Sequence, residues 1–97
     1  MVKTEKQFIL FYDLVEDYIW KREPLRAQHL SLVAETYHRG EVLAGGALSD
    51  PADQAVLVFR TREAAEAFAA KDPYVKNGLV REWRVRDWMT VVLDSLD

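Results

Sequence analysis

Short apolar runs that favour β-strands recur along the chain and give the first indication of its fold. Three of them cover Phe8–Val15, Val42–Leu48 and Gln54–Arg60. Each is rich in the β-branched and aromatic residues that suit a pleated surface, and each is too short to form a helix by itself. Turn-forming residues at Ser49–Pro51 separate the second run from the third. We therefore expect these two strands to pair as a hairpin.

Two further segments have the periodicity of amphipathic helices. In Pro24–Arg39 the apolar residues recur at spacings of three and four, and they are Leu25, Leu30, Val33, Ala34 and Tyr37. Pro24 suits a first helical turn, and Gly40 favours a left-handed stop. The second predicted helix is the Ala-rich segment Arg62–Ala70, which Thr61 can cap. Its predicted buried residues are Ala64, Ala65, Phe68 and Ala69.

A fourth strand is predicted over Leu79–Val85, with Leu79, Trp83 and Val85 directed inward. Thr90–Leu93 is either an extra strand or an arm that contacts a partner. The order of the main elements is β-α-β-β-α-β, which is the ferredoxin-like α+β plan: two helices cover one face of a four-stranded antiparallel sheet. We expect one domain over residues 1–97, because a chain of this length supports a single modest core.

The composition favours self-association. Hydrophobic residues make up 49% of the chain and aromatic residues 11%, which is high for so small a domain. The predicted sheet has one face without helices, and the same face of a second copy would cover it. We therefore predict a homodimer in which two sheets pack face to face as a dimeric α+β barrel.

Charge and residue types exclude several functions. A net charge of -3 disfavours bulk attraction to nucleic-acid phosphates or anionic membranes. The absence of cysteine excludes disulfides and thiolate metal sites and favours a cytoplasmic location. No leader is evident, and no apolar run approaches the ~20 residues of a membrane span. His29 and His38 do not have zinc-motif spacing, and Gly45-Gly46 lacks the full phosphate-loop pattern, so we expect no metal and no cofactor.

Arginines and tryptophans alternate near the end of the chain. A nucleic-acid stacking platform can have this pattern, in which Trp83 and Trp88 alternate with Arg81, Arg84 and Arg86. The adjacent acidic residues Glu82 and Asp87 indicate a mixed-charge strand instead. We therefore expect no nucleic-acid partner.

Two residues far apart in sequence are candidates for acid/base chemistry. His29 lies beside the apolar stripe of the first predicted helix, and Asp72 follows the second. A fold that brought them together would pair an imidazole with a carboxylate, as in general acid/base catalysis. Each also has a structural interpretation, since His29 suits a core boundary and Asp72 before Pro73 suits a turn. Arg26, one turn before His29, either extends into solvent or holds an anionic substrate.

Taken with their spacing, these segments resemble the YCII-related (YciI-like) family of small bacterial proteins. The shared features are Arg-x-x-His in the first helix, a Gly-rich strand with a polar turn, an Ala-rich second helix, and Asp-Pro-Tyr with a trailing Gly. The residues that carry them are Arg26, His29, Gly45, Gly46, Ser49, Asp50, Asp72, Pro73, Tyr74 and Gly78. The resemblance covers nearly the whole chain, and the segment Asp17–Glu23 departs from the family's usual pattern.

The resemblance implies a dimeric α+β barrel in which His29 and Asp72 meet in an active-site pocket. His29 would then act as general base or acid, while Asp72 would fix its tautomer and stabilise the imidazolium. The residues implied to bind a small-molecule substrate are Arg26, Gly46, Ser49 and Tyr74.

Two functions of different classes follow as expectations. The first is a lyase or isomerase that carries out proton transfer or dehydrohalogenation on small acidic ring-cleavage metabolites. The second is a non-catalytic dimeric module that binds a small ligand or serves as an accessory protein. Turnover of such acids distinguishes the two functions, because the second predicts binding alone.

Overall fold

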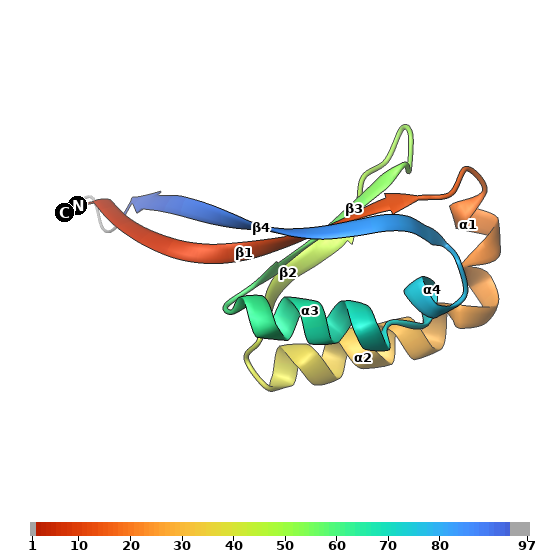
Figure 1. Ribbon diagram of the computed structural model, residues 1–97, viewed down its shortest axis with the longest axis horizontal. Helices are drawn as coiled ribbons and strands as arrows, with labels where there is room; N and C mark the ends of the chain where they lie inside the picture. The colour runs from red at the N-terminus through yellow and green to blue at the C-terminus, as the bar shows by residue number, and fades with distance from the viewer. Residues whose placement is uncertain (1, 94–97) are drawn as a thin grey trace.

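The computed structural model describes residues 2–93 as one sheet with helices on a single face (Figure 1). The elements in chain order are β1 (Val2–Leu14), α1 (Tyr18–Lys21), the 3-10 helix η1 (Glu23–Leu25), α2 (Arg26–His38), β2 (Val42–Ala47), β3 (Gln54–Phe59), α3 (Arg62–Lys71), α4 (Pro73–Lys76) and β4 (Val80–Leu93). The strands form a four-stranded antiparallel sheet in the order β2-β3-β1-β4. This is the predicted ferredoxin-like α+β fold, and β2 and β3 form the predicted hairpin.

The core lies between the sheet and the long helices α2 and α3. Alternate residues of β1 point toward these helices, and Leu10, Tyr12 and Leu14 are buried. On β3 the same face carries Leu57, opposite Leu10, and Phe59. The ring of Phe59 packs against that of Phe68 on α3, with 5.5 Å between the ring centroids.

Two of the predicted strands are longer than their apolar runs. β1 begins at Val2 rather than at Phe8, and β4 continues to Leu93, so the predicted extra strand Thr90–Leu93 is the end of β4. The segment of β1 before Phe8 pairs with β4 alone, and the two form a ribbon that projects beyond the rest of the sheet (Figure 1). The first part of β1 was not predicted, because Thr4, Glu5 and Lys6 are polar and exposed and lack the apolar alternation by which a strand is predicted.

The residues predicted to point inward at the last strand differ in how far they are buried. Leu79 is buried just before β4, and Val85 packs against the core. Trp83 pairs with Tyr12 and so shares the helix-side face, yet it is 37% exposed. Trp83 therefore points inward as predicted but is not buried, because β4 is an edge strand, whose large side chains are covered on one side only.

The first predicted helix is divided in the structure. Pro24 lies in η1, α2 begins at Arg26, and the additional short helix α1 precedes both. Leu25 and Val33 pack against the core as predicted. The predicted stripe was wrong at Leu30, at Ala34 and at Tyr37, all of which are exposed. The physical reason is that Leu30 borders a cavity instead of the core, while Ala34 and Tyr37 line an open groove between α2 and the edge strand β2.

The second helix agrees closely with its prediction. The Thr61 side chain accepts a hydrogen bond from the Ala64 amide at 3.1 Å, which caps α3 at its N-terminus. Ala65, Phe68 and Ala69 are buried, and Ala64 packs against the core.

The other face of the sheet is not covered by any helix of residues 2–93 (Figure 1). Ile9 and Phe11 of β1 and Val56 and Val58 of β3 lie on it, paired across the two strands and partly exposed. The guanidinium of Arg84 lies 5.0 Å from the centroid of the Phe11 ring. This open face therefore has an apolar centre and a charged edge.

Candidate active site

Asp72 occupies the junction between α3 and α4, where it ends one helix and begins the next. Its backbone amide donates to the carbonyl of Phe68 at 2.9 Å, which closes α3. Its side chain accepts from the Tyr74 amide at 3.0 Å and caps α4, where Pro73 takes the first helical position. The predicted turn is therefore a short helix, and the local structural role of Asp72 is real.

The same carboxylate holds two side chains from distant parts of the chain. His29 Nδ1 on α2 lies 2.9 Å from Asp72 Oδ1, and the hydroxyl of Tyr12 on β1 donates to Asp72 Oδ2 at 2.7 Å. The Asp72 side chain is 0% exposed, and the His29 side chain is 14% exposed. The fold thus brings together the histidine and the aspartate that the sequence singled out.

These contacts define the state of the imidazole. A carboxylate accepts hydrogen bonds and donates none, so the proton between His29 and Asp72 belongs to Nδ1 of His29. In the neutral ring Nε2 then carries a lone pair. The Tyr12 hydroxyl and the Tyr74 amide satisfy the remaining acceptor positions of Asp72 and leave the carboxylate fully paired although it is buried.

Aromatic rings hold the imidazole in place. The Tyr74 ring is stacked on His29, with 3.9 Å between centroids and 8° between planes. Phe68 meets the same imidazole edge-on at 6.2 Å. The orientation of His29 is therefore fixed by packing on two sides as well as by its bond to Asp72.

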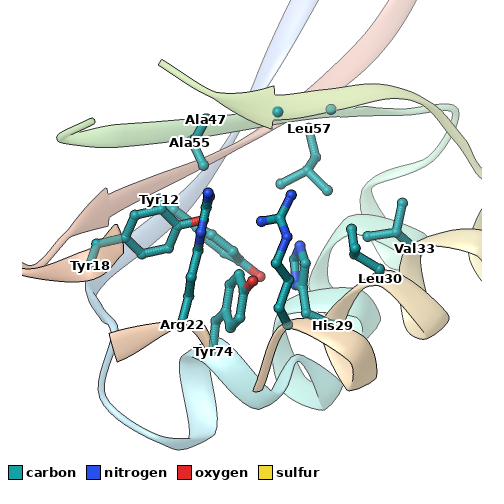
Figure 2. A pocket seen from close by; sticks show the side chains of 13 residues that line it. Tyr12, Tyr18, Arg22, His29, Leu30, Val33, Ala47, Ala55, Leu57 and Tyr74 are labelled. Carbon is teal, nitrogen blue, oxygen red and sulfur yellow. The ribbon is translucent and has the colours of Figure 1, made fainter. Parts of the chain in front are cut away.

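His29 and Tyr74 line a cavity of about 200 Å³ between the helices and the sheet (Figure 2). The cavity walls are mostly apolar, with arginine side chains at Arg22 and Arg26. Gly45 is part of the sheet wall, and a Cβ at this position would lie 2.9 Å from Leu57 Cγ. The absence of a side chain at Gly45 therefore lets β2 lie against Leu57 and keeps this wall thin.

Burial changes the acidity of two tyrosines at this site. Burial, followed by the negative charge of Asp72, raises the pKa of Tyr12. Burial also raises the pKa of Tyr74, and Tyr18 adds to the rise, while Arg26 and Arg22 act in the opposite direction. Both phenols are accordingly protonated at neutral pH and able to donate.

The structure places most of the predicted ligand-contacting residues around this cavity. Arg26, Gly46 and Tyr74 line it, whereas Ser49 lies exposed in the loop after β2 and is not part of its wall. The physical reason is that β2 ends at Ala47, before Ser49. A role for Ser49 in ligand binding stays a prediction.

Sequence reasoning missed three polar side chains of the cavity wall. They are Tyr12, Tyr18 and Arg22. Tyr12 shares the parity of Leu10 and Leu14 on β1, so strand alternation could have identified it as inward-facing. Tyr18 and Arg22 lie four residues apart at α1, a helix too short to give a periodic signal.

The described part of the chain contains no cluster of three or more His, Cys, Asp or Glu side chains arranged to hold a metal ion. None of the helices it describes is long and apolar enough to cross a membrane.

The fold and the pocket define a ferredoxin-like α+β protein with a histidine-aspartate pair in a small cavity. The family model of the YCII-related domain matches residues 6–89, and the chain belongs to this family. No curated protein matches the sequence.

Several solved structures are similar in fold. The 5-chloro-2-hydroxyhydroquinone dehydrochlorinase TftG from Burkholderia phenoliruptrix, in complex with 2,5-dihydroxybenzoquinone, superposes with a TM-score of 0.69 at 17% identity, covering 84% of this chain and 92% of that one. PA3566 from Pseudomonas aeruginosa has a TM-score of 0.56 at 12% identity, with coverages of 91% and 95%. A dimeric ferredoxin-like protein from an uncultured marine organism has a TM-score of 0.51 at 11% identity, with coverages of 98% and 94%.

Proposed function

We propose that this protein is a lyase or isomerase that moves a proton on a small, acidic, oxygenated substrate, with His29 as the base. The observation that carries the proposal is the 2.9 Å contact of His29 Nδ1 with the buried carboxylate of Asp72. His29 lines the cavity, and because its Nδ1 is engaged by Asp72, its other ring nitrogen, Nε2, is free to accept a proton. A purely structural histidine would not need a cavity beside it.

In the proposed reaction, Nε2 of His29 takes a proton from a substrate carbon next to a carbonyl group. The electron pair of the broken C–H bond forms a carbon–carbon double bond, and the carbonyl electrons move onto its oxygen. Asp72 stabilises the imidazolium that forms, and Arg26 holds an anionic group of the substrate. Return of the proton to another carbon gives isomerisation. Departure of a halide from the neighbouring carbon gives dehydrohalogenation.

The cavity supports a small substrate. Its volume of about 200 Å³ is below the range of about 300–1,000 Å³ of pockets for drug-sized ligands. The aromatic walls exclude water and strengthen the charge interactions inside. The fold likeness to TftG supports the choice of halogenated hydroxyquinol-type compounds in the first substrate panel.

We further propose that the protein is a homodimer formed through the open face of the sheet, around Ile9, Phe11, Val56 and Val58. An apolar centre with a charged edge is the composition of a protein interface. The same face of a second copy is self-complementary about a two-fold axis. The fold likeness to a dimeric ferredoxin-like protein supports this arrangement.

The test of the catalytic proposal is a turnover assay with chlorinated hydroxyhydroquinones and muconolactone-like acids. We expect the wild type and His38→Ala to convert at least one compound, because His38 is exposed at the end of α2. We expect His29→Ala and Asp72→Asn to lose about 10²–10⁴-fold in kcat, the contribution of a positioned general base. Turnover unchanged in His29→Ala contradicts the proposal. Binding of these acids without turnover by the wild type favours the ligand-binding module instead.

A further inference from the structure

Two side chains that line the cavity each have one buried polar atom without a hydrogen-bond partner among the described residues. These atoms are Nε of Arg22 and the hydroxyl oxygen of Tyr74. Buried polar groups are nearly always paired, because an unpaired one retains the full penalty of leaving water. Arg22 and Tyr74 therefore bring to the cavity hydrogen-bonding capacity that the described part of the chain does not use.

Aromatic side chains hold Arg22 in this position. Its guanidinium lies 5.2 Å from the centroid of the Tyr18 ring, and Nη1 donates to the Tyr18 hydroxyl at 3.5 Å. Tyr18 in turn meets Tyr74 edge-on at 5.7 Å. Figure 2 shows the long side chain of Arg22 extending into the cavity on the side of Tyr18, with Tyr74 between Arg22 and His29.

The helix itself does not need this guanidinium. Arg22 closes α1 through its backbone amide, which donates to the Tyr18 carbonyl at 2.9 Å. Any residue other than proline would make the same bond. Helix capping therefore does not explain why the guanidinium of Arg22 lies at the cavity.

Among the described residues, the cavity wall has two guanidinium groups and no acidic side chain. The guanidiniums are those of Arg22 and Arg26, and none of the other described lining residues is Asp or Glu. Among the described side chains, neither Arg22 nor Arg26 lies within ion-pair distance of a carboxylate. Asp72 lies behind His29 and is already occupied by Tyr12 and the Tyr74 amide. The two guanidiniums thus lack a counter-charge from the described part of the chain.

We propose that Arg22 forms a second anion-binding position, so that the substrate carries two anionic oxygen groups, one held by Arg26 and the other by Arg22. This inference rests on the proposed function, because it names the substrate class of the same site. The Tyr74 hydroxyl donates to an oxygen between the two groups. A volume of about 200 Å³, the share of about seven liquid waters, fits one small ring or short chain between them.

The two guanidiniums also act on Tyr74. Burial and Tyr18 raise the pKa of its phenol, and Arg26 and Arg22 oppose that rise. Both positive charges are therefore near the hydroxyl that is unpaired in the cavity. A dianion placed there would meet three donors from different elements.

The test is a calorimetric binding series with benzoate, phthalate, isophthalate and terephthalate, which differ in the number and spacing of carboxylates. For the wild type we expect at least one dicarboxylate to bind about tenfold more tightly than benzoate, the effect of one added charge-assisted hydrogen bond. Arg22→Gln abolishes this preference and leaves the benzoate Kd within about threefold. Arg22→Lys, which retains the charge but not the planar fork, keeps part of it.

Lys21→Gln is the matched control, because it removes one positive charge from the neighbouring residue, whose side chain is exposed and pairs with Asp17 outside the cavity. It should keep the wild-type preference. A dicarboxylate preference that survives in Arg22→Gln, or its absence from the wild type, overturns the inference. The titrations need no turnover, so a loss of selectivity and a failure of His29 as a base are measured separately.

Discussion

The imidazole of His29 lies parallel to the phenol ring of Tyr74, at 3.9 Å between centroids. Tyr74 is two residues after Asp72, whose carboxylate binds the same imidazole and the Tyr74 amide. One short segment, Asp72-Pro73-Tyr74, therefore holds His29 both by charge and by stacking. Pro73 stiffens the segment, so the two contacts move as one unit.

Asp72→Asn should destabilise the protein by about 1–3 kcal/mol, because an amide group that replaces one acceptor oxygen leaves a buried donor unpaired. Chemical denaturation measures the change in the free energy of unfolding. Asp53→Asn is the control: Asp53 is exposed, and its contact to Leu14 is made by its backbone carbonyl. Equal stability of the two variants would contradict the central place of Asp72 in the core.

Tyr12 gives the stability a pH dependence of definite sign. Burial and the charge of Asp72 raise its pKa above the ordinary 10.0, so the folded protein keeps this proton where the unfolded chain loses it. The stabilising contribution is complete below pH 10.0 and is lost as the pH rises above it. We expect the free energy of unfolding to fall above pH 10.0 in the wild type and to fall less steeply in Tyr12→Phe.

Tyr37→Phe provides the comparison for that experiment, because Tyr37 is 60% exposed. It should follow the wild-type curve. A Tyr12→Phe curve as steep as that of Tyr37→Phe would show that Tyr12 is not the group responsible.

Gly45→Ala should disturb the cavity wall, while Gly46→Ala should not. A Cβ on Gly45 would lie 2.9 Å from Leu57 Cγ, but a Cβ on Gly46 has no heavy atom within 4 Å. We expect Gly45→Ala to cost about 1–3 kcal/mol through overpacking and to weaken benzoate binding. Thermal unfolding and calorimetry of the two variants provide the measurement. Equal behaviour would mean that β2 shifts to accommodate the methyl group.

Ile9→Glu should weaken the proposed homodimer. Ile9 lies on the open face of the sheet, and an unpaired charge at the centre of an interface is strongly unfavourable. Sedimentation at micromolar concentration should give a dimer for the wild type and a monomer for Ile9→Glu. Ala70→Glu, an exposed position on α3, adds the same charge elsewhere and should remain dimeric. A monomeric wild type contradicts the proposed assembly.

The sequence predicted the order of the elements because each buried element carries its own periodic signal. Phe68 and its alanine neighbours on α3 show this well, since one helix face is small and apolar and the prediction for it was confirmed. The meeting of His29 with Asp72 was expected only from a family resemblance, because a contact between residues 43 apart leaves no local pattern. The partial exposure of Trp83 was not predicted for a related reason, because hydropathy does not show which strand lies at the edge of a sheet.

The most direct test of the account is the tautomer of His29, read from the nitrogen-15 NMR shifts of its neutral imidazole. We predict a proton on Nδ1, held by Asp72, and an unprotonated Nε2, with this preference lost in Asp72→Ala, which removes the acceptor. His38, the other histidine of the chain, is the internal reference and should be unchanged by that substitution. A proton on Nε2 of His29, or a tautomer that Asp72→Ala leaves unaltered, would contradict the assignment of His29 as the base.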